Sequence, residues 1–346
     1  MPTLSFEATR DVARSLLGEM GAPTDHASIV ADHLACCHLA GHDSHGLIRL
    51  PQYHRLVCEG QIVTTTEPRL EKETASTALI DGCWTWGQVV AKKATSVAME
   101  KARSSGLAVV SARDCNHIGR LGAYALEAAE QGFVAKVWCN VHGIVRMAPW
   151  GGLDPRFGTN PLAIAIPRRG KPIVVDITTT AVAEGKVRLA RNRGVDIPEG
   201  WILDKEGNAT TNPADLYDGG TLLPFGGPLG HKGYGLALVV DLLGGALTGS
   251  GCGAMPGVRV GNGITVEVLD PGAMGDREEF LDRVESFVEY VQSSRPKPGV
   301  ESILLPGEPE FRTEESRRRD GIVIDDGTWE QLGQVAADLG IKLPSA

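Results

Sequence analysis

The residues from Gly41 to Tyr53 concentrate side chains that can move protons and bind anions. This stretch holds two histidines, an aspartate, a serine, an arginine and a tyrosine. Imidazole exchanges protons near neutral pH, whereas guanidinium stays cationic. The combination is typical of an acid/base site that handles a carboxylate. Because a polar turn between two helices would use the same residue types, this stretch alone leaves both interpretations open.

A second candidate is His117, within the run Asp-Cys-Asn-His-Ile-Gly at positions 114–119. The run follows a predicted strand and precedes a predicted helix, which is where α/β folds display reactive side chains. His117 is therefore a candidate acid/base residue, and Asn116 could orient a substrate oxygen. The competing interpretation is a histidine that only caps the helix.

Two glycine-rich runs could bind phosphate. Lys232 lies in the run 226–233, which opens a predicted helix and suits an anionic ligand, although a simple exposed lysine would look the same. No serine or threonine follows this lysine, so the run is not a Walker A loop. The run 249–254 fits GxGxxA, but it follows a predicted helix rather than a strand. We interpret it as a glycine loop and not as a Rossmann fingerprint.

The closely spaced histidines His38, His42 and His45 suggest a different class of protein, a metal-dependent hydrolase. His38 and His42 are four residues apart and would share one face of a helix. Gly41 weakens a helix at that point, and the sequence has no HExxH signature. We therefore assign no metal site here, and the metal-dependent hydrolase stays as an alternative function.

The pattern of apolar residues predicts elements that would position these side chains. Three amphipathic helices, with Ser5 as the N-cap of the first, make the first sixty residues a small helical lobe. The chain then alternates between strands and helices, with two consecutive strands at 162–166 and 172–177, which indicates a mixed sheet. The other predicted strands are 77–81, 107–112, 133–140 and 264–269. The predicted helices are 5–20, 23–39, 50–58, 88–104, 121–131, 180–190, a buried helix at 235–247, 278–292 and 328–339, with a turn-rich stretch at 201–224.

Composition narrows the classes of function. The chain has 346 residues, of which 42% are hydrophobic, and 43 acidic against 34 basic residues give a net charge of -9. This balance disfavours nucleic-acid binding. Seven cysteines without a CxxC pair indicate a reducing, cytoplasmic location. We recognise no signal peptide, and the most apolar window, 235–247, is too short to cross a bilayer, so no membrane association is expected.

Taken together, the motifs resemble the malate/L-lactate dehydrogenase family of NAD(P)-dependent oxidoreductases without a Rossmann fold. This family also includes ureidoglycolate, sulfolactate, diketogulonate and cyclic-imine enzymes. The matching segments follow the family's order over almost the whole chain. They are Asp43-Ser44-His45-Gly46 with Arg49, Asn116-His117-Ile118-Gly119, 148–152, 158–162, Asp176-Ile177-Thr178-Thr179, Gly185-Lys186, 198–201, 230–236 and Pro306-Gly307-Glu308.

The resemblance implies an α/β (α+β) fold with a largely antiparallel central sheet, flanking helices and a helical lobe from both chain ends. Residues 1–75 and 309–346 would form that lobe, and residues 76–308 would bind the nicotinamide cofactor, NAD or NADP. The resemblance also implies a homodimer. The cofactor contacts that it implies are Asn140, Asp176, Ile177, Thr178, His231, Lys232, Pro306, Gly307 and Glu308.

By the same resemblance, the catalytic residues are His45, His117, Arg49, Ser44, Tyr53 and Asn116. Hydride transfer to a 2-keto carbon leaves an alkoxide, which His45 or His117 would protonate. Arg49, supported by Tyr53, would hold the substrate carboxylate. Because Pro51 is comfortable only in a first turn, we expect a helix from about Ile48, with His45 just ahead of it.

The expected activity is therefore a dehydrogenase of 2-hydroxy acids such as malate or lactate. The alternatives are a cyclic-imine reductase of the delta-1-piperideine-2-carboxylate type, a ureidoglycolate dehydrogenase, or a binding module that kept the fold without turnover. The segment 141–147 departs from the family pattern. Its His142 and Arg146 could contact a second anionic group or a cofactor phosphate, but exposed loop residues are the favoured interpretation.

Overall fold

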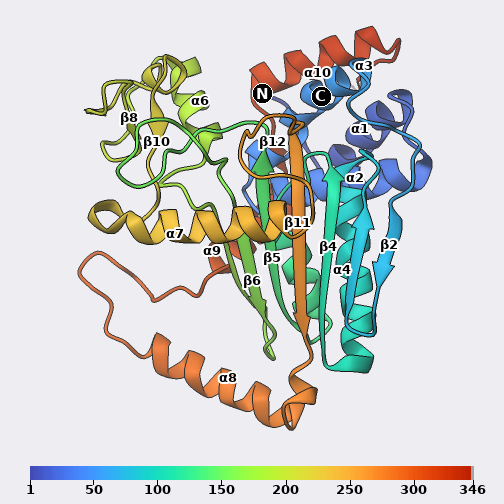
Figure 1. The fold of residues 1–346 in the computed structure, drawn as a ribbon, viewed down its shortest axis with the longest axis vertical. Coiled ribbons are helices and arrows are strands. Elements are labelled where there is room, and N and C mark those ends of the chain that lie inside the picture. The colour runs from blue at the N-terminus through green and yellow to red at the C-terminus, as the bar shows by residue number, and fades with distance from the viewer. Residues whose placement is uncertain (344–346) are drawn as a thin grey trace.

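A seven-stranded sheet forms the centre of the computed structural model, which describes residues 1–343 (Figure 1). The strand order is β2-β3-β4-β11-β5-β6-β7, and only the β3–β4 pair is parallel. The largely antiparallel, non-Rossmann sheet expected from the sequence is thus confirmed. The strands are β2 (Arg69–Glu73), β3 (Thr77–Asp81), β4 (Leu107–Cys115), β5 (Val134–His142), β6 (Leu162–Ile166), β7 (Ile173–Ile177) and β11 (Gly261–Leu269).

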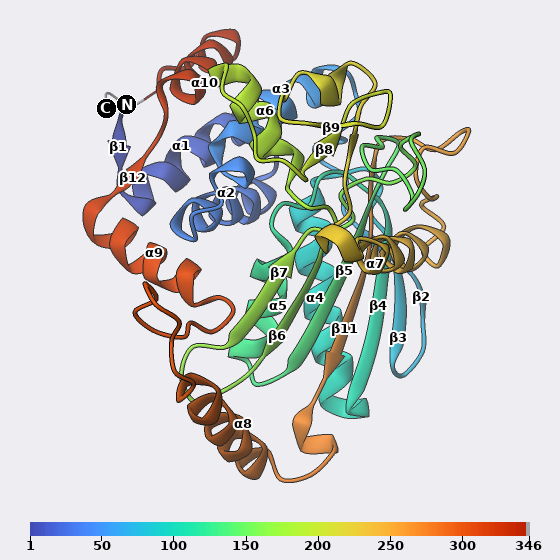
Figure 2. The same ribbon diagram turned by 90° about the vertical axis from the view of Figure 1, so that its left-hand side faces the viewer.

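Helices α4 (Gly87–Ser105) and α5 (Leu121–Glu130) cover one face of this sheet (Figure 2). Alanines spaced three or four residues apart let α4 lie close to the strands. Alternate residues of β11 supply the other half of the same core. The residues concerned are Ala91, Ala94, Ala98, Ala102, Ile264, Val266 and Val268, all 1% exposed or less.

The opposite face carries α7 (His231–Asp241), which continues into a π-helical turn, Leu242–Ala246. Gly244 lies so close to β5 that an added Cβ would come within 2.6 Å of the Asn140 backbone nitrogen. Without a side chain at Gly244, the backbone of this turn packs directly against β5. The helix begins four residues earlier than expected, however, and it is not buried throughout, because Leu238, Val239, Leu242 and Leu247 are 40–59% exposed. Apolar composition alone does not show that a helix face lacks a covering element.

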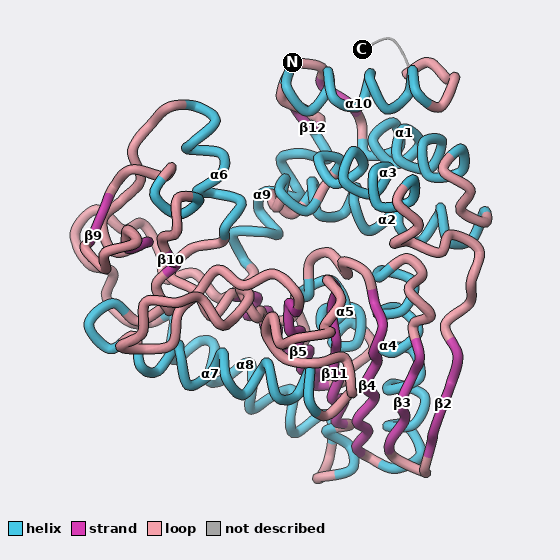
Figure 3. Tube along the Cα trace, turned by 45° about the horizontal axis from the view of Figure 1, so that its top comes forward, coloured by secondary structure: helices cyan, strands magenta, loops and turns pink. Residues whose placement is uncertain are grey.

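Both ends of the chain pack together in a helical lobe at one end of the sheet (Figure 3). The Ser5 side chain accepts a hydrogen bond from the Ala8 amide, so the predicted N-cap is confirmed. Helix α3 matches the predicted range 50–58 at both ends. The elements of the lobe are α1 (Phe6–Glu19), α2 (Thr24–Leu39), α3 (Leu50–Cys58), α10 (Asp326–Asp338) and the paired strands β1 (Thr3–Leu4) and β12 (Ile322–Val323).

A third apolar cluster joins α6 (Glu184–Arg193) to a small sheet of β8 (Ile202–Leu203), β9 (Ala209–Thr210) and β10 (Thr221–Leu222). Helix α6 begins four residues later than expected. Thr180, which the prediction placed in the helix, instead forms a β-bridge with Pro224. The stretch predicted as turn-rich holds these three two-residue strands, which are too short to show an alternating pattern.

Two further helices connect the sheet to the C-terminal end. Helix α8 (Arg277–Gln292) buries only Val288 and is tied to the loop after β6 by an Arg168–Glu285 ion pair. Helix α9 (Glu308–Asp320) was not predicted, because it has no buried residue and therefore no apolar stripe. Among the described residues, no helix is long and apolar enough to cross a membrane.

Candidate active site

Two one-turn 3-10 helices form the first part of the stretch from Gly41 to Tyr53. The first is η1 (Asp43–His45) and the second η2 (Leu47–Arg49), after which α3 begins at Leu50 with Pro51 in its first turn. His45 therefore lies ahead of the α-helix, as the position of Pro51 predicts. The break at Gly46 separates His45 from the helix on which Tyr53 lies.

A hydrogen-bonded clamp fixes this loop. His38 Nδ1 lies 2.7 Å from Asp43 Oδ1, and its Nε2 accepts a bond from the Leu47 amide at 2.9 Å. Arg317 of α9 donates to both Asp43 oxygens. An added Cβ at Gly46 would lie 2.3 Å from His38 Nε2, so glycine is required there. The C-terminal segment thus helps to hold the loop that displays His45.

His117 follows β4 and faces the same loop. Its ring centroid lies 5.6 Å from that of His45, with the two planes 21° apart. His117 Nδ1 is 2.8 Å from the Tyr53 hydroxyl, which accepts a 2.7 Å bond from Gln88 Nε2. With Gln88 as donor, the Tyr53 proton is left for His117 Nδ1. The hydrogen of a neutral His117 is then on Nε2.

Burial and nearby cations lower the affinity of both histidines for a proton. Burial is the largest cause in each case, and the Arg49 guanidinium is the next, so the pKa values of His45 and His117 lie well below 6.5. Both rings are therefore neutral at pH 7 in the structure as it stands. An anion bound to Arg49 would oppose its effect and raise both pKa values.

Arg49 is held by its neighbours but keeps hydrogen-bonding capacity. Its Nε donates to the Ser44 carbonyl at 2.7 Å, and its Nη1 donates to Gln52 at 3.0 Å. Nη2 makes no hydrogen bond within the described residues. Burial lowers the pKa of this guanidinium without removing its charge. A partly buried cation with free donors is suited to a carboxylate.

Ser44 lies between His45 and the first turn of α6. Its hydroxyl is 3.1 Å from His45 Nδ1. An added Cβ at Gly185 would be 3.6 Å from the Ser44 Cβ, so a side chain at this position of α6 would contact the loop. The site is therefore bounded by the helical lobe, the β4 loop and α6.

Asn116 is placed beside this site, but its amide is used by the protein. Its Nδ2 donates to the backbone carbonyls of Trp84, Thr85 and Gln61 at 2.6, 3.0 and 3.3 Å. The residue is 6% exposed. In this structure Asn116 holds the β4 loop, which gives no direct support to the prediction that it orients a substrate oxygen.

Most of the predicted cofactor residues lie along the outer edge of the sheet, where β7 is the last strand. The Pro306 carbonyl accepts a bond from the Val174 amide at 2.9 Å, and an added Cβ at Gly307 would lie 3.1 Å from the Val174 side chain. Asp176 accepts from the Gly122 amide at the start of α5 at 2.9 Å and from Arg120 Nε at 3.1 Å. Glu308 opens α9 beside this edge, and Ile177 is 39% exposed on it.

The edge continues from the end of β7 to the start of α7. Thr178 lies just before Thr179, whose carbonyl accepts from the Phe225 amide at 3.0 Å. Gly233 packs against Phe225, and the two preceding residues, His231 and Lys232, are exposed in the first turn of α7. The positive end of the helix and a lysine together suit a phosphate.

Asn140 is the exception among the predicted cofactor residues. It is fully buried, and its side chain bonds to Asp241, Gly251 and Gly263 at 3.1, 2.9 and 2.9 Å. Its position in the structure is that of a support between β5, β11 and the turn after α7.

The structure does not unite the histidines of the metal-site alternative. His38 bonds to Asp43 and Leu47, His42 lies 3.3 Å from Glu310, and His45 contacts Ser44. Within residues 1–343 the one group with metal-ligand spacing lies elsewhere and includes none of these three. The hydrolase alternative therefore has no structural support.

His142 is not the exposed loop residue that was favoured. It is 1% exposed, its Nδ1 lies 2.5 Å from the Arg259 carbonyl, and its ring packs edge-on against Trp84. Arg146 is partly buried near the small sheet, where its carbonyl accepts from Leu222.

Gln88, which bonds to Tyr53, was missed, because a glutamine inside a helix carries no sequence signal.

The chain matches the family described as malate/L-lactate dehydrogenase over residues 4–333. It is 38% identical over 335 residues to a malate dehydrogenase of Pyrococcus horikoshii, covering 94% of this chain and 92% of that protein. Its fold is similar to sulfolactate dehydrogenase from Methanocaldococcus jannaschii, with a TM-score of 0.90, 35% identity and coverage of 99% and 98%. It is also similar to a delta1-piperideine-2-carboxylate reductase from Pseudomonas syringae, with a TM-score of 0.85, 32% identity and coverage of 97% and 100%.

Proposed function

Because the chain belongs to the malate/L-lactate dehydrogenase family and is thus an oxidoreductase of 2-hydroxy acids, we propose that Arg49, His45 and His117 form its substrate site. The observation that carries this proposal is the convergence of two neutral imidazoles, 5.6 Å apart, beside one partly buried guanidinium. The guanidinium binds the substrate carboxylate through its free donors, and this fixes the orientation of the neighbouring carbonyl.

The two histidines have different tasks in this proposal. His117 has its Nδ1 occupied by Tyr53, so its Nε2 hydrogen can only donate to the substrate oxygen and polarise it. His45 contacts the Ser44 hydroxyl, which can either donate or accept, so its ring can change protonation state. We assign to His45 the proton that the substrate oxygen gains on reduction and loses on oxidation.

A nicotinamide cofactor supplies the hydride when it is bound. The exposed edge of β7 and the lysine-bearing start of α7 fit such a group, because they offer backbone donors, a helix N-terminus and a cation along one path. In the proposal Asp176, Ile177 and Thr178 hold its middle part, while Pro306, Gly307 and Glu308 on one side and His231 and Lys232 on the other hold the rest. Asn140 supports the sheet beneath it. Either NAD or NADP is accommodated by this chemistry.

A cyclic imine that carries a carboxylate is the second candidate substrate. The structural similarity to the piperideine-carboxylate reductase favours it, since such an imine combines a carboxylate with a polarised double bond. Arg49 and His45 would serve it in the same roles. The malate and sulfolactate enzymes show equal or greater similarity, which places the 2-keto acid first.

The test is a spectrophotometric screen of the purified protein with NADH and NADPH against pyruvate, oxaloacetate, sulfopyruvate and the cyclic imine. We expect oxidation of one cofactor with a 2-keto acid. His45→Gln should lower kcat by about 10²- to 10⁴-fold, which is the usual contribution of a positioned acid/base. His117→Gln, which keeps a donor, should lose less. Absence of turnover with every pair, or full activity of His45→Gln, would refute the proposal.

We further propose a homodimer in the cytoplasm. The exposed apolar side chains of α7 and α8 support the dimer, and seven free cysteines support a reducing location. The proposed division into a lobe of residues 1–75 and 309–346 and a cofactor domain of residues 76–308 is supported by a shared apolar core of both chain ends. Because β2 pairs with β3 in the large sheet, the first boundary fits better before Arg69.

A further inference from the structure

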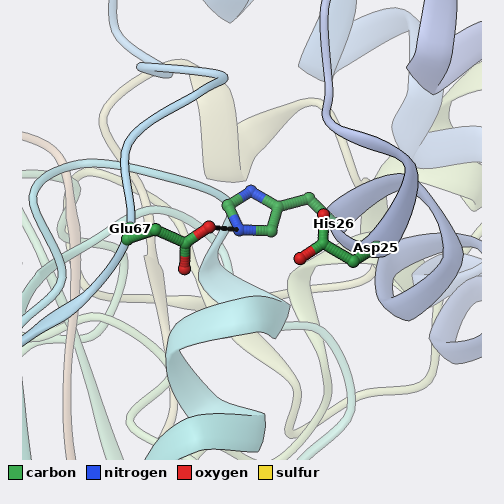
Figure 4. A group of neighbouring side chains, drawn as sticks. All are labelled: Asp25, His26 and Glu67. Carbon is green, nitrogen blue, oxygen red and sulfur yellow. Dashed lines mark ion pairs between the residues drawn. The ribbon is translucent and has the colours of Figure 1, made fainter.

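Three side chains of metal-ligating type meet at the start of α2, outside the site described above. Asp25 and His26 lie in the first turn of α2, and Glu67 lies in the linker that joins α3 to β2. One ligand atom from each lies within 4.8 Å of the other two. Figure 4 shows the imidazole with the Glu67 carboxylate on one side and the Asp25 carboxylate on the other.

The His26 ring is buried but not satisfied. It is 1% exposed, and neither ring nitrogen forms a hydrogen bond within residues 1–343. Nε2 lies 2.9 Å from Glu67 Oε1, so the two groups pair by distance, yet the oxygen is not aligned with the ring N–H. A buried imidazole without an aligned partner is costly and calls for a ligand.

Two side chains that bind the same metal ion also lie close together without forming an aligned hydrogen bond to each other. Zinc binds imidazole nitrogen and carboxylate oxygen at about 2.0 to 2.2 Å, so tetrahedral ligand atoms lie about 3.4 Å apart. Ligand atoms direct their lone pairs at the ion and not at each other. The His26–Glu67 distance of 2.9 Å, the upper limit of 4.8 Å for all three pairs, and the misaligned His26–Glu67 pair fit this geometry after small side-chain rotations.

We propose that His26, Glu67 and Asp25 bind a divalent transition-metal ion such as Zn²⁺, with water as the remaining ligand. Both carboxylates are exposed, so an ion can reach the site from solvent. Their two negative charges outweigh the positive end of the α2 dipole. The set of one nitrogen and two oxygens suits zinc better than calcium or magnesium, which prefer oxygen alone.

The ion would tie the linker to the helical lobe. The same linker already bonds to the segment that precedes α4, through Thr64, whose carbonyl accepts from Trp86 Nε1 at 3.1 Å, and through Val63, whose amide donates to Trp84 at 3.0 Å. Gln88, two residues after Trp86, bonds to Tyr53 in the active site. The metal therefore has a structural role at the joint between lobe and sheet, and it takes no part in the chemistry.

The experiment uses the full-length protein, treated with EDTA, dialysed and then supplied with ZnCl₂. We expect one more zinc per chain in the wild type than in Glu67→Gln, measured by isothermal titration and elemental analysis. Saturating zinc should raise the unfolding temperature of the wild type by about 4 to 8 °C and that of Glu67→Gln by less than about 1 °C. Asp25→Asn should lie between the two.

Glu19→Gln is the matched control, because Glu19 is an exposed carboxylate of the same lobe without an ion pair in the described residues. It should behave as the wild type. Zinc bound elsewhere, for example at the catalytic histidines, would appear equally in all variants. Equal stoichiometry and an equal temperature shift in Glu67→Gln and Glu19→Gln would overturn the proposal and leave a plain His26–Glu67 ion pair.

Discussion

The Tyr53 hydroxyl sets the direction in which His117 holds its proton. It lies between Gln88 Nε2 and His117 Nδ1, at 2.7 and 2.8 Å, and the whole Tyr53 residue is 2% exposed. Buried hydrogen-bond chains of this kind fix both a ring orientation and a tautomer. The residue that the sequence suggested as a support for Arg49 thus acts on a histidine more than sixty positions further along the chain.

Removing this hydroxyl should impair the chemical step more than substrate binding. We expect Tyr53→Phe to lower kcat about 10- to 100-fold, because a tilted ring misplaces its donor, while KM for the 2-keto acid stays within about threefold. Steady-state kinetics with the preferred substrate provides the measurement. Gln88→Met is the companion variant. It keeps the phenol but removes the donor that directs the phenol proton toward His117, and it should show a smaller loss of kcat. An unchanged kcat in Tyr53→Phe would show that the hydrogen bond does not matter.

At the scale of single residues, the sequence shows which side chains could carry chemistry, but it does not show the hydrogen bonds that they form. His45, Arg49 and His117 could be named as candidates, because reactive side chains near glycines and at a strand end are visible in the sequence. Gln88 could not, because its importance comes from a contact across 35 positions. The engagement of Asn116 with three backbone carbonyls also depends on contacts over 31 to 55 positions.

Between elements, His33 joins α2 to the start of α5. Its Nε2 accepts a 2.9 Å bond from the Arg120 amide, and its ring stacks on Tyr124 with centroids 5.1 Å apart. An added Cβ at Gly119 would lie 2.1 Å from the ring, so the approach of the two segments depends on glycine. Burial, with a further contribution from Arg120, lowers the pKa of His33 from 6.5 to about 3.

This joint makes stability depend on pH. An unfolded His33 binds a proton below pH 6.5, whereas the folded one does not until about pH 3. The stabilising contribution is therefore fully present above pH 6.5 and is lost as the pH falls toward 3. For His33 alone the loss between pH 7 and pH 5 is roughly 2 kcal/mol.

Denaturant unfolding at pH 7 and pH 5 measures this loss. In His33→Gln, which keeps an acceptor for the Arg120 amide, the difference between the two pH values should shrink by about 2 kcal/mol, whatever the absolute stability of the variant. His54→Gln, which replaces a partly buried histidine of α3, is the matched control. The explanation is wrong if the free energy of unfolding falls by the same amount between pH 7 and pH 5 in His33→Gln and in the wild type.

The elements themselves were predictable where one face of each is buried. The strand at 77–81 and the helix at 50–58 agree with the structure at both ends, because their burial alternates with the period of the element. The start of α7 was placed too late, since glycine and lysine at 232–233 look like a loop. The pairing of β11 with β4 and β5 could not be predicted from local sequence patterns, because the partner strands lie more than a hundred residues away.

The molecule as a whole leaves large apolar side chains uncovered on its outer helices. Phe287 and Tyr290 of α8 are 65% and 74% exposed, and their rings stack with centroids 6.4 Å apart. Together with the exposed leucines of α7, they are what a protein–protein contact would cover. They support the proposed homodimer.

The double variant Phe287→Ser, Tyr290→Ser should shift the protein from dimer to monomer. Two exposed aromatics at the centre of a contact are worth several kcal/mol of association, about 2 or more each. Sedimentation velocity at micromolar concentration gives the readout. Val323→Ser, which removes another exposed apolar side chain (52%) from the helical lobe, should stay dimeric. A wild type that sediments as a monomer, or a double variant that remains a dimer, would contradict this assignment.

The place of β11 in the sheet has a consequence for how the chain is made. β11 lies between β4 and β5, yet it is synthesised roughly 130 residues after β5, which at about 5 to 20 residues per second takes about 6 to 25 s. During that time the nascent chain on the ribosome has two strands with unpaired edges facing an empty position. Such edges are templates for association with other chains. The chain of this enzyme is therefore prone to association with other chains during its own translation. This period ends only when β11, the last strand of the large sheet, has been made and has paired.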